Sequence, residues 1–85
     1  MNYQFPQYRR LANQLSYYKI ESPSELLEIQ RMGQRWTQHQ LIAKILPERL
    51  LIQDILENEG GRYEIIDESA FNDFLKMCTD TLMRF

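Results

Sequence analysis

Residues 47–67 read PERLLIQDILENEGGRYEIID, and their first half is compatible with either a helix or a strand. As a helix, residues 47–58 open with Pro47 in the first turn and carry one apolar stripe, made by Leu51, Ile52, Ile55 and Leu56. As a strand, residues 51–56 would pair with residues 63–66 through the glycine turn at 60–61. We favour the helix, because the charged residues at 48 and 49 suit a first turn and the aspartate at 54 is unfavourable within a strand.

The second half of this stretch predicts a short strand and then a helix. Residues 63–67 follow two glycines and are aromatic or β-branched, which is typical of a strand. Its backbone needs a partner, for which the candidates are residues 3–5, the preceding segment or the same strand of a second molecule. Asp67 is expected to cap a last helix over residues 68–84. The apolar stripe of that helix is Phe71, Phe74, Cys78, Leu82 and Phe85, with Leu75 beside it.

Apolar spacing in the N-terminal half predicts three more helices, over residues 6–19, 22–33 and 37–46. The first has a stripe at helical spacing, made by Tyr8, Leu11, Leu15 and Tyr18. Ser22 and Glu25 form a capping-box pattern at the start of the second, and Gly33 is suited to end it. Thr37 can cap the third, with Trp36 packing on Leu41 as a hydrophobic staple.

Together these elements predict a mainly α-helical fold for residues 1–85. It is a single domain, a compact bundle of about five short helices with one short strand or small hairpin before the C-terminal helix. The composition agrees, since the chain has eleven leucines and eight glutamines and no valine.

The composition also limits the class of protein. With 85 residues, 44% hydrophobic and 26% charged, the chain is typical of a small globular domain. It contains no apolar run of the roughly 20 residues that cross a bilayer. Its first residues lack the pattern of a secretory signal, so we expect a cytoplasmic protein without a membrane partner. The single cysteine excludes an intrachain disulfide and a zinc site built from several cysteines.

The formal net charge of −2 is unevenly distributed along the chain. Residues 1–50 hold seven basic and four acidic groups, a net charge of +3. Residues 51–85 hold three basic and eight acidic groups, a net charge of −5. Such a separation of charge can steer a charged partner. Alternatively, the two parts neutralise each other when they pack together or when a second copy docks.

Catalytic chemistry is poorly supported, and we expect a protein that is not an enzyme and needs no metal or other cofactor. His39, the only histidine, is predicted near the start of the third helix, with no carboxylate or nucleophile placed beside it. Cys78 falls on the apolar stripe of the last helix, which favours a buried thiol over a nucleophile. No glycine-rich phosphate loop is present.

We therefore expect a small regulatory or accessory protein that acts through protein–protein contacts and self-associates, such as a regulator, inhibitor or assembly factor of a bacterium or phage. Its apolar residues are more numerous than so small a core can hide, which favours a homo-oligomer or a dedicated partner surface. Tyrosine, tryptophan and arginine dominate the energetic centres of protein interfaces. The predicted contact residues are Arg31, Arg35, Trp36 and His39 around Gly33, together with Tyr17 and Tyr18.

The alternative is a small DNA-binding regulator of the winged-helix type. Residues 61–75 resemble the wing and final helix of excisionase-type DNA-binding modules, through Gly61–Asp67 and then Phe71, Phe74 and Leu75. The resemblance implies a recognition helix over residues 47–58, but three acidic residues stand there against one arginine. The pI near 5.3 is also unfavourable for binding nucleic acid.

Overall fold

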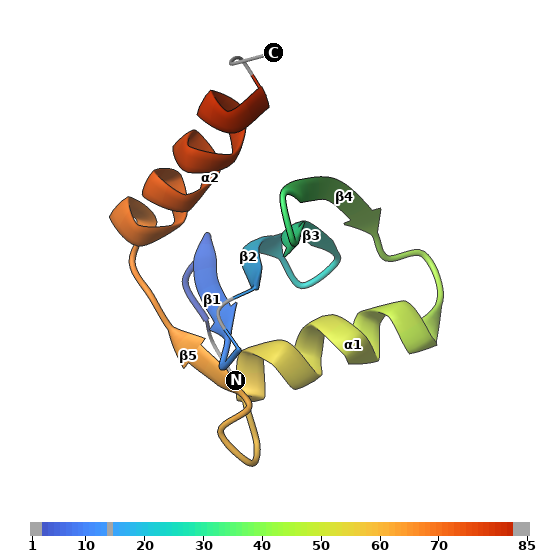
Figure 1. The fold of residues 1–85 in the computed structure, drawn as a ribbon. Helices are drawn as coiled ribbons and strands as arrows, with labels where there is room; N and C mark the ends of the chain where they lie inside the picture. The colour runs from blue at the N-terminus through green and yellow to red at the C-terminus, as the bar shows by residue number, and fades with distance from the viewer. Residues whose placement is uncertain (1–2, 14, 83–85) are drawn as a thin grey trace.

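Five antiparallel strands form one sheet, and two helices cover its opposite faces (Figure 1). The structure is a computed structural model that describes residues 3–13 and 15–82. Its strands are β1 (Gln7–Leu11), β2 (Ser16–Ser22), β3 (Glu25–Met32), β4 (Arg35–Ile42) and β5 (Tyr63–Ile65), and its helices are α1 (Leu46–Glu57) and α2 (Glu68–Leu82). The strand order is β4-β3-β2-β1-β5, so β4 and β5 are the two edges of the sheet.

Two short loops connect the three strands from β2 to β4. Ser22 and Glu25 face each other across the first loop, where the Ser24 N–H donates to the Ser22 hydroxyl at 3.2 Å. Met32 and Arg35 face each other across the second loop, which begins with Gly33 at a φ of 64°. A positive φ at the first loop position alone is the type II′ geometry, which matches the twist of the flanking strands.

Each face of the sheet forms a hydrophobic core with one helix. The core under α1 contains Tyr18, Ile20 and Leu26 from the sheet and Ile52, Ile55 and Leu56 from the helix. The core under α2 contains Tyr8, Tyr17 and Ile29 from the sheet and Phe71, Phe74 and Cys78 from the helix. Tyr17 stacks on Phe74 with ring centroids 3.8 Å apart and an interplanar angle of 10°. The fold is therefore three-layered, with the sheet in the middle.

The prediction of a mainly α-helical bundle is wrong, and the two covered faces give the physical reason. A strand that is buried on both faces carries apolar residues at consecutive positions, so the two-residue period disappears from its sequence. Tyr17 and Tyr18 are such neighbours, each in a different core. Leu26 and Leu27 are separated between the two cores in the same way. The resulting apolar spacing imitates that of a helix.

The local helix signals of the N-terminal half are corrected in the same way. The serine of the predicted capping box caps a turn between β2 and β3. Trp36 does not pack on Leu41, because alternation along β4 turns Trp36 toward the α2 core and Leu41 toward the α1 core. The winged-helix alternative loses its structural basis, since residues 3–13 and 15–82 contain no helix-turn-helix.

The predicted order of elements in the C-terminal half is confirmed. Residues 46–57 are helical, and the Glu48 carboxylate accepts from the N–H groups of Lys44 and Ile45 at 3.0 and 3.3 Å. Asp67 caps α2 by accepting from the Ala70 N–H at 2.8 Å. The predicted partners of the short strand are wrong, because β5 pairs with β1 of the same chain. The side chain of Leu82 and the whole of Phe85, both predicted for the α2 stripe, lie outside the described residues.

Candidate protein-binding surface

The six predicted contact residues do not form one patch. Tyr17 and Tyr18 are both buried, on opposite faces of the sheet, so neither is available to a partner. His39 lies on β4 rather than on a helix, and it is exposed opposite Glu28 of β3. Arg31, Arg35 and Trp36 are brought together at the end of the β3–β4 hairpin.

The hairpin end forms a narrow crevice with α2. Its lining residues are Arg31, Gln34, Arg35 and Trp36 of the hairpin and Met77 and Cys78 of the helix. Burial raises the pKa of the Cys78 thiol, and the positive charge of Arg31 lowers it by less. With an accessible volume of about 10 Å³, the crevice is too small for an organic ligand. These residues bring the hairpin end and α2 side by side.

The feature that sequence reasoning missed is the open edge of β4. Residues that flank a two-residue hairpin loop exchange both backbone hydrogen bonds, which turns Arg35 and every second residue after it toward β3. The Ala43 N–H follows this alternation, since it donates to the Ser24 carbonyl at 2.7 Å. The intervening backbone N–H and C=O groups therefore point away from the sheet, at Trp36, Gln38, Gln40 and Ile42.

The β4 edge lacks the features that usually protect a sheet edge. Proteins commonly block such edges with charges, proline, bulges or a covering segment. β4 contains no proline, and Arg35 is its only formally charged residue. Six of its eight residues are exposed. The opposite edge, β5, is only three residues long, and a short edge offers little backbone to a partner.

Exposed apolar side chains continue from the end of β4 into α1. Ile42 and Ile45 are 53% and 59% exposed, and Leu46 and Leu50 on the first turns of α1 are 66% and 46% exposed. We call these four residues the β4–α1 patch. Alternation along β4 places Ile42 on the α2 side of the sheet, whereas Leu46 and Leu50 belong to the helix on the other face, so the four residues lie around the end of the strand. Several exposed apolar residues so close in sequence are candidates for a contact site.

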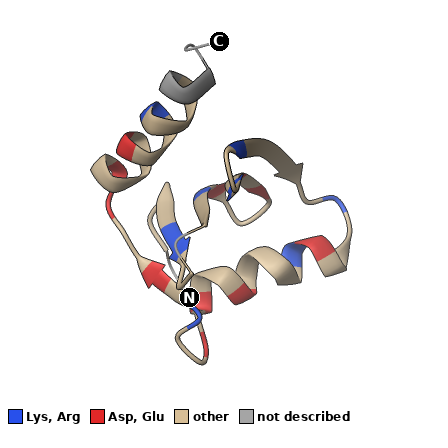
Figure 2. Cartoon of the chain, viewed as in Figure 1, with Lys and Arg blue, Asp and Glu red and all other residues tan. Residues whose placement is uncertain are grey.

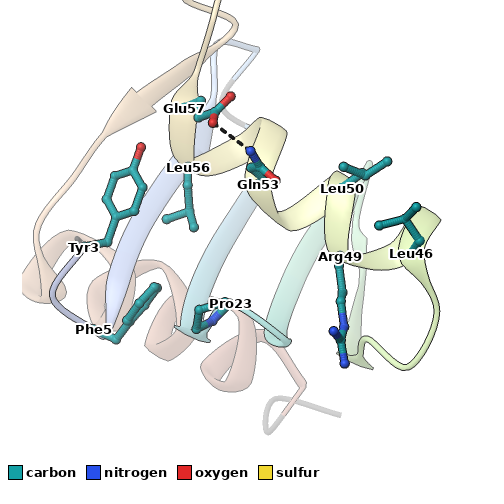
Figure 3. Close-up of a pocket in the computed structure, with 9 residues that line it drawn as sticks. All are labelled: Tyr3, Phe5, Pro23, Leu46, Arg49, Leu50, Gln53, Leu56 and Glu57. Atoms are coloured by element: carbon teal, nitrogen blue, oxygen red, sulfur yellow. Dashed lines mark hydrogen bonds between the residues drawn. The ribbon is translucent and has the colours of Figure 1, made fainter. Parts of the chain in front are cut away.

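A surface pocket of about 740 Å³ borders the same helix (Figure 3). Its aromatic side is formed by Tyr3 and Phe5 of the N-terminal segment, with Pro23 of the β2–β3 loop nearby. Its helical side is formed by residues of α1 from Leu46 to Glu57, including Arg49 and Gln53. The Gln53 side chain donates to the Glu57 carboxylate at 2.9 Å, so part of the polar rim is already paired. The pocket shares two leucines with the β4–α1 patch, Leu46 and Leu50.

The fold brings parts of the basic and acidic halves of the sequence into contact. Acidic and basic residues lie on the sheet and on both helices (Figure 2). Arg10 of β1 holds Glu64 of β5 through two contacts of 3.1 Å, Nε to Oε1 and Nη2 to Oε2, which raise the pKa of Arg10. Its guanidinium carbon also lies 5.7 Å from the centroid of the Tyr17 ring. This pair joins the basic and acidic parts of the chain at the β5 side of the sheet, away from β4.

Arg9 is almost fully buried beside the C-terminus of α1. Its guanidinium donates to the Tyr8 carbonyl at 2.9 Å and to the Leu56 carbonyl at 3.4 Å. Burial lowers the pKa of Arg9. The negative end of a helix dipole stabilises a cation, which accounts for a buried arginine at this place. Its position indicates a structural role between β1 and α1.

Clusters that would hold a metal are absent from the part of the chain that the structure describes, where no three His, Cys, Asp or Glu side chains converge. Within that part, no helix is both long and apolar enough to span a bilayer.

Comparisons with known proteins add no relative, since no family, no curated protein and no solved structure matches the chain.

Proposed function

We propose that this protein is a non-enzymatic regulatory or accessory protein that acts through protein–protein contacts, and that it self-associates through the β4 edge. The observation that carries the proposal is an eight-residue edge strand that contains no proline and one charge, and whose outward side pairs with no other strand of residues 3–13 and 15–82. Addition of a strand to such an edge is a recurring mode of protein recognition, in which backbone hydrogen bonds supply affinity.

The exposed apolar residues next to this edge support the proposal. The β4–α1 patch continues the polar backbone edge with apolar side chains, whose burial against a partner is favourable. Of the predicted contact residues, Trp36 and His39 belong to β4, and Arg35 begins it. Tyr17 and Tyr18 are not part of the proposed surface, because both are buried.

The test uses a substitution that blocks only the open side of β4. The Gln38 N–H points away from β3, so Gln38→Pro removes an outward donor and leaves the β3–β4 hydrogen bonds in place. The matched control is Gln38→Ala, which keeps the N–H group. Light scattering coupled to size exclusion, across a range of protein concentrations, measures the mass of each variant.

We expect the wild-type protein and Gln38→Ala to form dimers, and Gln38→Pro to shift strongly toward the monomer. Circular dichroism checks that all three proteins keep the same fold. A wild-type protein that remains a monomer up to its solubility limit refutes the proposed self-association. A Gln38→Pro variant that is folded and as dimeric as the wild type shows that association uses another surface.

A further inference from the structure

We infer that the partner strand is β4 of a second copy, paired antiparallel about a two-fold axis at His39. This inference rests on the proposed function, and adds to it the partner and the register. It would join two five-stranded sheets into one continuous sheet of two copies.

Symmetry first restricts the possible registers. A two-fold axis normal to the sheet keeps each face on its own side and reverses the strand direction. Residues directly opposite each other must lie on the same face, so the axis passes beside a residue that faces its own copy. Each possible register is therefore named by one central residue of β4.

His39 is the centre that uses the whole open edge. With His39 facing itself, Trp36 is opposite Ile42 of the second copy, and Gln38 is opposite Gln40. All four outward residues then form reciprocally bonded pairs, which give about eight backbone hydrogen bonds across the interface. Moving the axis to Gln38 places Ile42 opposite Gln34 in the hairpin loop, and moving it to Gln40 places Trp36 opposite Lys44 beyond the strand.

The side chains that meet in this register are complementary. Trp36 lies beside Ile42 of the second copy on the α2 side of the sheet, twice per dimer. Pairs of aromatic and β-branched residues stabilise neighbouring antiparallel strands. The half-exposed Ile42 side chain would be covered in this way. Gln38 and Gln40 of the two copies form a neutral pair in which each amide can donate and accept.

Arg31 and Glu25 on the neighbouring strand do not oppose the same register. Arg31 is opposite Trp36 within the hairpin, and Glu25 is opposite Ile42. Pairing of Trp36 with Ile42 of the second copy therefore places Arg31 and the second Glu25 in one row, at either end of this apolar pair. The two charges are three strand spacings apart, about 14 Å, so they add little attraction but place no like charges against each other.

The β4–α1 patch also gains a counterpart. In this register residue 45 of one copy lies beside residue 33 of the other, at the tip of the β3–β4 hairpin. The hairpin carries Met32, which is 57% exposed, next to that tip. Ile45 and Leu46 of one copy and Met32 of the second would then share an apolar contact.

Disulfide trapping tests the central residue directly. Opposed residues of a non-hydrogen-bonded pair have Cα atoms about 4.5 Å apart, which is within the range of a disulfide. In a Cys78→Ala background, His39→Cys should therefore form a covalent dimer under mild oxidation. The matched control is Thr37→Cys, which is also exposed and lies on the same face. Its two copies are four residues apart, about 13 Å, which is too far for a disulfide.

A mixture of Thr37→Cys and Leu41→Cys provides a positive prediction for the same register, because these two residues oppose each other across the axis. We expect trapping of His39→Cys and of the mixture, little trapping of Thr37→Cys alone, and loss of all trapping when Gln38→Pro is added. Light scattering on the reduced variants shows whether each still dimerises.

The outcomes separate the register from the proposed function. Reduced variants that dimerise while His39→Cys fails to trap, or while Thr37→Cys traps equally well, overturn the register and leave self-association standing. A wild-type protein that is monomeric by light scattering overturns both. Trapping that survives Gln38→Pro at the same rate reflects random collision and also overturns the inference.

Discussion

Asn58 connects α1 to β5, and we predict that its replacement destabilises the fold by a few kcal/mol. It ends the helix in the left-handed region, with φ of 54° and ψ of 39°. Its side-chain amide forms two hydrogen bonds with the Tyr63 backbone: it donates to the Tyr63 carbonyl at 2.6 Å and accepts from the Tyr63 N–H at 2.8 Å. Its own carbonyl accepts from the Gly61 N–H at 3.1 Å. One residue therefore holds both the helix end and the start of the last strand.

The expected magnitudes follow from these contacts. Each hydrogen bond contributes about 0.5–1.5 kcal/mol, so Asn58→Ala, which loses both side-chain bonds and keeps a Cβ in the left-handed region, should cost about 1–3 kcal/mol. Asn58→Gly loses the same two bonds but removes the Cβ from the left-handed region, which returns about 1–2 kcal/mol, partly offset because glycine gains more entropy on unfolding. Asn58→Asp keeps the acceptor for the Tyr63 N–H, but it replaces the donor with a carboxylate oxygen that faces the Tyr63 carbonyl at the negative end of the helix. The predicted order of stability is wild type, then Asn58→Gly, then the Ala and Asp variants.

Urea unfolding followed by Trp36 fluorescence measures this order, with the transition midpoints compared directly. In a domain of this size, each 1 kcal/mol corresponds to a shift of about 4–8 °C in the thermal midpoint, so heating gives an independent check. Hydrogen exchange at the Tyr63 amide should accelerate in the Gly and Ala variants. An Asn58→Ala midpoint equal to that of the wild type, or an Ala variant more stable than the Gly variant, would refute the reasoning.

Three further predictions concern the cores, a turn and the response to pH. Phe71 is 1% exposed in the α2 core, so Phe71→Ala should cost about 3–5 kcal/mol in urea unfolding, whereas Ile65→Ala, at 74% exposure, should cost less than about 0.5 kcal/mol. Gly33→Ala places a side chain at a φ of 64° and should cost about 1–2 kcal/mol; a stabilised variant would contradict the turn geometry. Burial raises the pKa of Cys78 and of Tyr18, so the folded state keeps protons that the unfolded chain releases above about pH 8.5 and 10. The free energy of unfolding should therefore be steady below about pH 8 and fall toward pH 11. A urea midpoint that rises over that range would contradict the burial of these two side chains.

The sequence alone predicted the elements that depend on local contacts. The helix of residues 46–57 and the Asp67 cap of α2 rest on interactions within one or two turns, which the residue order displays directly. The apolar stripe of α2 was also predictable, because a helix covered on one side keeps its 3.6-residue period. Phe71, Phe74 and Cys78 accordingly lie buried on one face.

The candidate binding surface was predictable only in part. Arg35, Trp36 and His39 were selected from residue type, and all three lie on or at the start of β4. They were selected as residues on or beside predicted helices, which gave no indication of a sheet edge. A sheet edge is defined by which strands pair and which do not. The two short loops at Ser22–Glu25 and Met32–Arg35 were the available signal, because each is flanked by runs of similar length that can pair.

The residue order by itself determined the charge balance and the helices whose stabilising contacts are local. Tertiary structure alone decided that residues 7–11, 16–22, 25–32 and 35–42 form strands, because each strand is stabilised by partners distant in sequence and by helices on both faces. Because both faces of the sheet are covered, apolar residues stand at consecutive positions in a strand. The alternation by which a strand is recognised in a sequence is then lost. Tertiary structure also decided that Tyr17 and Tyr18 are buried apart, and that β4 is left as the open edge.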